Sequence, residues 1–218
     1  MKRGTPPMRK SNESSLPLLD PGEDTAASVG LFLKKKSEWF TELASGETDA
    51  LEICRLHSLS IDRALSELFN SAASRGNSQG RVSMLALGGY GRREMGLHCD
   101  IDVLFLHDEA SRSRMPVITD AILYPFWNNS VEVGGATRTA ADCREIIEKD
   151  IRAFTALTES RHICGDPSLS SEVAHIVDSR LTDSKFRRHF IETKHSEMQR
   201  RLARYGDSIY LLEPNVKE

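Results

Sequence analysis

LGGYGRREMGLHCDIDVLFL, which runs from Leu87 to Leu106, is the stretch that decides the fold. Two short, mostly apolar runs, 81–87 and 101–106, frame it. Runs of this length next to glycine are typical of buried strands. Gly88 and Gly89 follow the first run, and two glycines there let the backbone approach an anion closely. The stretch therefore predicts two strands joined by a candidate phosphate-binding turn, and the alternative is that the two glycines form an ordinary turn.

Asp100 and Asp102 lie at the start of the second run and are separated by one residue. Because side chains alternate between the faces of a strand, both carboxylates are expected to project from the same face. Adjacent carboxylates repel each other unless a cation lies between them. Mg²⁺ accepts such oxygen ligands, usually one or two carboxylates together with substrate phosphates. The pair is therefore a candidate magnesium site, and the alternative is a solvated strand end with ordinary surface acids.

A third candidate strand, 131–133, carries Glu132 between two valines, and Gly134-Gly135 is expected to end it. If the valines belong to the core, Glu132 points to the opposite face, which could be the face of the aspartate pair. Three carboxylates can hold two Mg²⁺ ions, one for an attacking hydroxyl and one for a triphosphate. The alternative for Glu132 is a charged side chain that an edge strand exposes to solvent.

The rest of the chain divides by composition and periodicity. Residues 1–24 are rich in Pro, Ser, Gly and charge, and we expect them to be a disordered tail. Apolar spacings of three, four and seven predict an amino-terminal helical hairpin over 25–80. The catalytic sheet is expected over 81–140 and a helical segment, truncated at its end, over 141–218. Beyond the hairpin, we expect a short helical turn at 90–95 and helices at 114–127, 140–149, 151–164, 168–180 and 184–204.

Charge and cysteine content limit the class of protein. The 218 residues carry a net charge of −3, which argues against binding of nucleic acid by bulk charge. No apolar run is long enough for a membrane span, and the basic start MKRGTPPMRKSNESS lacks the apolar core of a signal peptide. The four cysteines are far apart and are expected to be reduced thiols. We therefore expect a cytoplasmic protein with no nucleic-acid or membrane partner.

The order Gly-Gly, Asp-x-Asp in a hydrophobic strand, then an apolar-Glu-apolar strand resembles the polymerase-beta-like nucleotidyltransferase superfamily. Further motifs resemble the amino-terminal transferase domain of the bifunctional PII uridylyltransferase/uridylyl-removing enzyme family. They are GGYGRREM, CDIDVLFL, YPFW, VEVGGATRT, Glu159-Ser160-Arg161 with Gly165-Asp166, and the closing RYGDSIYLLEPNVKE. The resemblance runs from about residue 82 to residue 218. It implies an α+β fold with a small mixed sheet, preceded by the helical hairpin and followed by the helical segment.

The resemblance also implies an activity, which is Mg²⁺-dependent transfer of UMP from UTP to a tyrosine of the PII nitrogen-regulatory protein. Pyrophosphate is the second product. The site residues implied are Gly88 and Gly89 as the phosphate loop, Asp100, Asp102 and Glu132 as metal-binding catalytic acids, and Arg92 and Arg138 as nucleotide contacts. For Arg92 the alternative is a surface arginine paired with an acid. The family continues into a phosphohydrolase domain and sensing domains, so we expect the uridylyl-removing part to be absent from this chain.

Five positions depart from the family pattern, and these departures leave two other functions open. Cys99 stands where Ser is usual, Arg93 where Gly is common, Asn128 where an acid follows the Trp, and Gly135-Ala136 where His-Ser is usual. One alternative is a transferase of the same superfamily with another nucleotide or acceptor. The other is a catalytically silent regulatory or partner-binding domain.

Overall fold

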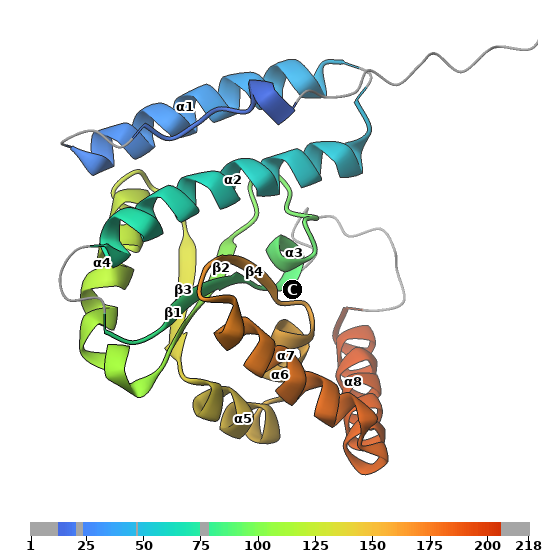
Figure 1. Ribbon diagram of the computed structural model, residues 1–218. Coiled ribbons are helices and arrows are strands. Elements are labelled where there is room, and N and C mark those ends of the chain that lie inside the picture. Colours follow the sequence, from blue (N-terminus) through green and yellow to red (C-terminus); the bar gives the residue numbers. More distant parts are fainter. Residues whose placement is uncertain (1–12, 21–23, 47, 75–78, 206–218) are drawn as a thin grey trace, which may run out of the picture. The chain divides into compact units, whose positions relative to one another are not determined.

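Helices surround one small sheet in the computed structural model, which describes residues 13–20, 24–46, 48–74 and 79–205 (Figure 1). The chain divides into two units, Met1–Ala174 and His175–Glu218. All but the first two residues of the closing motif RYGDSIYLLEPNVKE lie outside the described residues.

The sheet has four strands, β1 (Val82–Ala86), β2 (Ile101–His107), β3 (Val133–Arg138) and β4 (Arg161–Gly165), in the order β3-β2-β1-β4. β2 pairs with β3 in parallel, whereas β1 pairs with both β2 and β4 in antiparallel fashion. The expectation of an α+β fold with a small mixed sheet is therefore confirmed. This arrangement is consistent with a polymerase-beta-like fold.

Helices α1 (Thr25–Ala44) and α2 (Ala50–Ala73) lie where the apolar spacing predicts a hairpin. Each begins at an aspartate whose carboxylate accepts hydrogen bonds from backbone N–H groups of the first turn, which are Ala27 for Asp24 and Leu51 and Glu52 for Asp49. α2 contacts α4 (Met115–Trp127), and apolar side chains of both helices share one core cluster with Ile101, Val103 and Phe105 of β2. This face of the sheet is therefore covered by helices.

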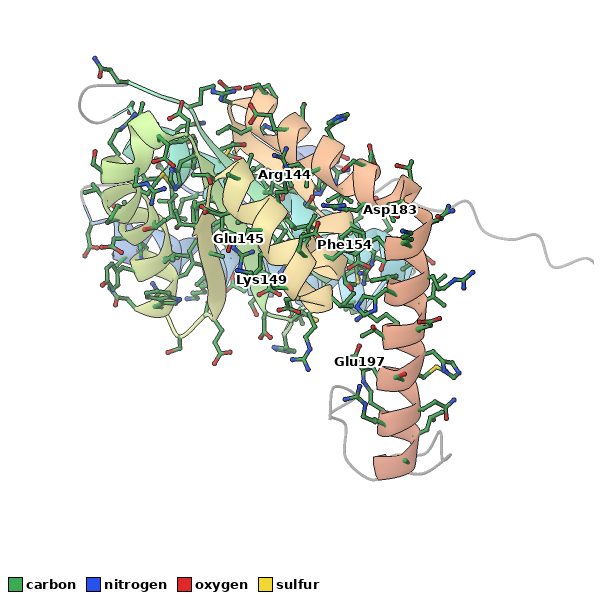
Figure 2. All side chains as sticks on the ribbon, turned by 90° about the horizontal axis from the view of Figure 1, so that it is seen from below. Arg144, Glu145, Lys149, Phe154, Asp183 and Glu197 are labelled. Atoms are coloured by element: carbon green, nitrogen blue, oxygen red, sulfur yellow. The ribbon has the colours of Figure 1, made fainter. Side chains whose placement is uncertain are left out.

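The other face of β2 carries Leu104 and Leu106, which are also buried. Figure 1 shows α5 (Ala140–Lys149) and α6 (Ile151–Thr158) on the side of the sheet away from α2. On the outer surface of α5, Glu145 and Lys149 form an ion pair (Figure 2). Burial on both faces explains why 101–106 is an almost continuous apolar run, as expected for a central strand.

The prediction that a strand spans 131–133 and ends at the two glycines is wrong. β3 begins at Val133 and continues through Gly134-Gly135 to Arg138. Parallel pairing with β2 supplies backbone partners for these residues, and such a partner lies far away in sequence. Glu132 directly precedes β3, and its carbonyl accepts a hydrogen bond from Ile101 N–H at 3.3 Å.

The prediction of one helix over 151–164 is also wrong. α6 ends at Thr158, and β4 follows as the edge strand beside β1. A short segment of mixed polarity gains strand hydrogen bonds only from its neighbour in space, so its own periodicity does not reveal it. Residues 141–218 are thus not purely helical, because 161–165 complete the sheet.

Two smaller expectations need correction. The short helix α3 spans Gly88–Gly91 rather than 90–95, so the two glycines begin the helical turn instead of preceding it. Within the expected tail, Glu13–Ser15 form a 3-10 helix, and Leu16 and Leu19 are buried. The prediction of disorder is wrong for 13–20, and residues 1–12 and 21–23 lie outside the described residues.

Two further helices, α7 (Pro167–Thr182) and α8 (Ser184–Tyr205), lie near the predicted ranges. Asp183 accepts hydrogen bonds from the backbone N–H groups of Lys185 and Phe186 and so caps α8 (Figure 2). None of the helices that the structure describes is long and apolar enough to span a membrane.

Candidate active site

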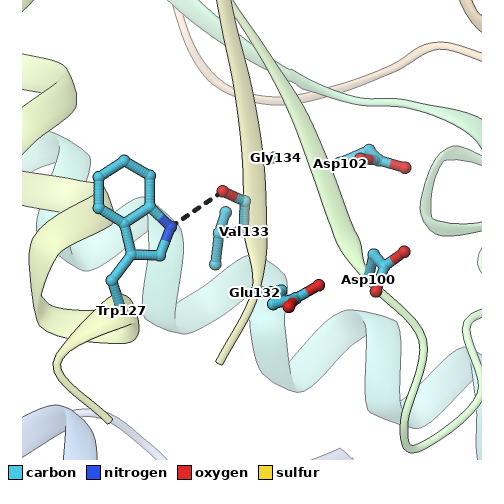
Figure 3. A pocket seen from close by; sticks show the side chains of 6 residues that line it. All are labelled: Asp100, Asp102, Trp127, Glu132, Val133 and Gly134. Carbon is cyan, nitrogen blue, oxygen red and sulfur yellow. Dashed lines mark hydrogen bonds between the residues drawn. The ribbon is translucent and has the colours of Figure 1, made fainter. Parts of the chain in front are cut away.

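Three acidic side chains meet where β2 and β3 begin. Asp100, Asp102 and Glu132 line one pocket of about 330 Å³ together with Trp127, Val133 and Gly134. Figure 3 shows all three acid side chains on the same side of β3, with the Trp127 ring on the other side. The sequence-based expectation that Glu132 shares a face with the aspartate pair therefore agrees with the geometry.

The strand register places these acids. Ile101 pairs with Val133 and Asp102 with Gly134 across the parallel strands. Ile101 and Val133 are buried, whereas Asp102 is exposed, because successive side chains on a strand point to opposite faces. A Cβ atom at Gly134 would lie 2.7 Å from Asp102 Oδ1. Gly134 therefore leaves the space that the Asp102 carboxylate occupies.

The glycine turn lies directly beside the acids. Leu87 N–H donates a hydrogen bond to the Asp102 carbonyl at 3.0 Å, and Gly88 is the next residue. Gly88 has φ +55°, a left-handed conformation that favours glycine. A Cβ atom there would have no neighbour within 4 Å, so the space beside the turn is open. The turn is thus joined by a backbone hydrogen bond to the strand that carries Asp102, although neither Gly88 nor Gly89 lines the acid pocket.

Arg92 lies at the end of this turn and is already paired with two acids. Its Nε donates to Glu94 Oε2 at 2.7 Å, and its Nη1 to Glu159 Oε2 at 2.5 Å. The hydrogen bond that Arg92 donates to the Glu94 carboxylate raises the pKa of Arg92. The alternative of a surface arginine paired with acids describes its contacts in this structure.

Arg138 lies away from the three acids. It ends β3 opposite Leu106, whereas Asp102 lies opposite Gly134. Arg138 lies four residue steps along the strand from Gly134, which is a distance of about 13 Å at roughly 3.3 Å per residue. The structure thus assembles the glycines, the aspartate pair and Glu132, but leaves Arg138 at the other end of the strand.

The donor chemistry of the pocket suits a hard cation. Among the residues that the structure describes, no group of three or more His, Cys, Asp or Glu side chains is arranged to hold a metal ion. Mg²⁺, however, is usually held by one or two carboxylates together with substrate phosphates and water, and does not need a closed protein cage. The all-oxygen set of Asp100, Asp102 and Glu132 fits this mode.

Sequence reasoning missed a buried network behind the turn. Arg161 of β4 donates two hydrogen bonds to the Asp62 carboxylate of α2, at 2.8 and 3.0 Å, and Tyr90 Oη donates to Asp62 Oδ1 at 2.7 Å. Burial raises the pKa of Tyr90, and the Asp62 carboxylate adds to that shift. The motif Glu159-Ser160-Arg161 was visible in the sequence, but its partner 99 residues earlier was not.

A second buried pair supports the loop between the turn and Asp100. Lys36 Nζ lies 2.9 Å from His57 Nε2, and His57 Nδ1 lies 3.2 Å from the carbonyl oxygen of Met95. Nδ1–H therefore donates to Met95, and Nε2 accepts from Lys36. Burial lowers the pKa of His57 to about 4 and that of Lys36 to about 8. Neutral His57 thus joins α1 and α2 to the loop.

His57 makes stability depend on pH on the acid side. Because its pKa in the folded chain, about 4, is below its ordinary value of 6.5, the unfolded chain binds a proton that the folded chain does not. The stabilisation is complete above about pH 6.5 and is lost as the pH falls towards 4. We expect this group to lower the free energy of unfolding by about 2 kcal/mol between pH 7 and pH 5.

Urea unfolding at several pH values measures this dependence. The variant His57→Gln should show a flatter profile between pH 7 and pH 5, whereas His195→Gln, at an exposed position on α8, should keep the wild-type slope. Equal slopes in all three proteins would contradict the assignment.

Comparison with known proteins relates the chain to a group of curated enzymes. No family model matches it. It is 38% identical over 141 residues to the bifunctional uridylyltransferase/uridylyl-removing enzyme of Cereibacter sphaeroides. The aligned region covers 63% of this chain and 15% of the relative. The chain is homologous to one part of the uridylyltransferase/uridylyl-removing enzymes. The resemblance noted in the sequence is thereby confirmed.

Two other uridylyltransferase/uridylyl-removing enzymes extend the match. The enzyme of Erythrobacter litoralis is 31% identical over 192 residues, which is 85% of this chain and 21% of the relative. The enzyme of Methylococcus capsulatus is 34% identical over 172 residues, which is 78% of this chain and 19% of the relative. The chain thus spans about a fifth or less of the length of these relatives.

Proposed function

We propose that this chain is a nucleotidyltransferase that transfers UMP from UTP to a tyrosine of a PII signalling protein and releases pyrophosphate. The observation that carries the proposal is the convergence of Asp100, Asp102 and Glu132 on one pocket beside the Gly88-Gly89 turn. The names of the curated relatives supply the uridylyl group as the one transferred.

The residues of the pocket have distinct roles in this proposal. Asp100, Asp102 and Glu132 would hold Mg²⁺, which when bound lowers the pKa of the attacking hydroxyl and neutralises the leaving pyrophosphate. The backbone N–H groups of the glycine turn orient the triphosphate. The tyrosine hydroxyl gives its proton to solvent and its oxygen attacks the α-phosphorus in line. The new oxygen–phosphorus bond forms as the bond from the α-phosphorus to the bridging oxygen of pyrophosphate breaks. Preorganised positioning and charge supply the catalysis, without a covalent enzyme intermediate.

Cysteine content and net charge suggest the compartment and the class of partner for this activity. All four cysteines are free, which suits a reducing cytoplasm, and the net charge of −3 suits a protein or nucleotide partner better than a nucleic acid. We therefore propose a cytoplasmic transferase whose partners are UTP and the PII acceptor.

Labelled nucleotides test the proposal directly. Purified chain is incubated with PII protein, Mg²⁺ and each of the four α-labelled nucleoside triphosphates, and the label on PII is measured. We expect label from UTP alone, and its loss when EDTA removes the metal. Label from ATP in place of UTP would identify another transferase of the superfamily.

One observation favours the alternative of a silent binding domain. Arg92, a candidate nucleotide contact, already forms ion pairs with Glu94 and Glu159. Isothermal titration with UTP in the presence and absence of Mg²⁺ separates the two functions. Metal-dependent UTP binding supports the transferase, whereas no binding under either condition would support the silent domain.

A further inference from the structure

We propose that Arg161 and Asp62 are positioning residues that hold the glycine turn in its phosphate-binding conformation. This inference rests on the proposed function for the identity of the ligand, the triphosphate of UTP. Neither residue lines the acid pocket, so both would act through the turn rather than on the nucleotide.

The side chain of Arg161 contacts the backbone of the turn. Its Nε donates to the Gly91 carbonyl at 3.1 Å, and its Nη2 donates to the Tyr90 carbonyl at 3.2 Å. The guanidinium also lies 5.5 Å from the centre of the Tyr90 ring. Two consecutive carbonyls of α3 are thus bound by one side chain. Both carbonyls belong to the last residues of a four-residue helix, and the Tyr90 carbonyl also accepts a hydrogen bond from Arg93 N–H at 3.1 Å.

Asp62 fixes Arg161 from the opposite side. Its carboxylate accepts two bonds from Arg161 and one from Tyr90 Oη, and the side chains of Arg161 and Asp62 are only 20% and 12% exposed. The guanidinium of Arg161 makes four hydrogen bonds at once, two to the Asp62 carboxylate and two to carbonyls, whereas the ammonium group of lysine has only three N–H donors. The pairing is therefore specific for arginine.

The segment just before β4 contacts the same turn twice more. The backbone of Glu159 packs directly against Gly91, where an added Cβ would lie 3.0 Å from the Glu159 carbonyl carbon. The Glu159 carboxylate pairs with Arg92 at 2.5 Å. The turn is therefore held by α2 and β4 together, although it is a short helix with an open side at Gly88. Such external support is what a preorganised binding turn requires.

Arg161→Lys tests the inference because it keeps the positive charge beside Asp62 but removes the planar guanidinium that binds Asp62 and the two carbonyls together. Arg81→Lys is the matched control: Arg81 also bonds partners from another element, Ser168 and Glu172 of α7, but it lies just before β1 at the end away from the turn. Two readouts are compared in both variants. They are hydrogen exchange of the Gly91 and Arg92 amides, which donate to Leu87 and Gly88 at 3.0 Å, and the kinetics of UMP transfer.

In Arg161→Lys we expect exchange of these amides about tenfold faster and a KM for UTP about tenfold higher, with kcat changed less than about threefold. Arg81→Lys should leave both exchange and KM unchanged. If Arg161→Lys does not fold, Tyr90→Phe, which removes only the hydroxyl donor to Asp62, should show the same pattern at about threefold.

Each result decides the inference. Unchanged exchange at the turn would overturn it, as would faster exchange with an unchanged KM in an active enzyme. A wild-type chain without any transfer activity would contradict the proposed function alone, and the exchange comparison with Arg81→Lys would still decide whether Arg161 positions the turn.

Discussion

Under the proposed function, Asp102→Asn is expected to lower the rate of UMP transfer by about a thousandfold, since the amide would remove a charge from the pocket where pyrophosphate charge would develop. The backbone of Asp102 is held on both sides, because it pairs with Gly134 on one side and its carbonyl accepts a hydrogen bond from Leu87 N–H on the other. The substitution keeps the size of the side chain, so the strand register should not change. Transfer of labelled UMP from UTP to PII measures the effect.

The control is Asp120→Asn, at an exposed position on α4 outside the pocket, which should keep wild-type activity. Thermal unfolding of both variants checks that loss of activity is not loss of structure. Combining Asp100→Asn with Asp102→Asn should abolish transfer. If the double variant transferred UMP at the wild-type rate, the assignment of the two carboxylates would be wrong.

Gly91→Ala is expected to lower the free energy of unfolding by about 3 kcal/mol or more. The new methyl group would overlap the carbonyl oxygen of Glu159 and would also lie 3.1 Å from the Ala86 carbonyl oxygen. Both neighbours are backbone atoms, one in the paired strand β1 and one between α6 and β4, so relieving the overlap would displace the main chain rather than a flexible side chain.

The neighbouring Gly89 provides the matched control in the same helix. A Cβ there would meet only Arg92 Nη2, at 3.8 Å, which is ordinary contact. Gly89→Ala should therefore change the free energy of unfolding by less than about 1 kcal/mol. Urea unfolding of both variants makes the comparison, and similar losses in the two would contradict the close packing of Gly91 against Glu159.

Local pattern was sufficient for the strands and helices whose apolar spacing is strong. β2 was visible because burial on both faces makes it apolar throughout, and α2 because its buried residues recur along one side. β4 and the true extent of β3 were not visible. Both are edge strands whose hydrogen bonds come from β1 and β2, far away in sequence, and Gly134-Gly135 looked like a strand end until the parallel register gave them partners.

For the candidate site the same division holds. The sequence by itself determined which acids are candidates, because alternation along an apolar run places Asp100 and Asp102 on one face, although the strand assumed around Glu132 begins only at Val133. Only the tertiary structure decided that Arg138 lies away from the pocket, that Arg92 is paired with acids, and that Arg161 reaches back to Asp62. The physical reason is range: alternation acts between neighbouring residues, whereas hydrogen bonds and ion pairs depend on which segments the core packing brings together.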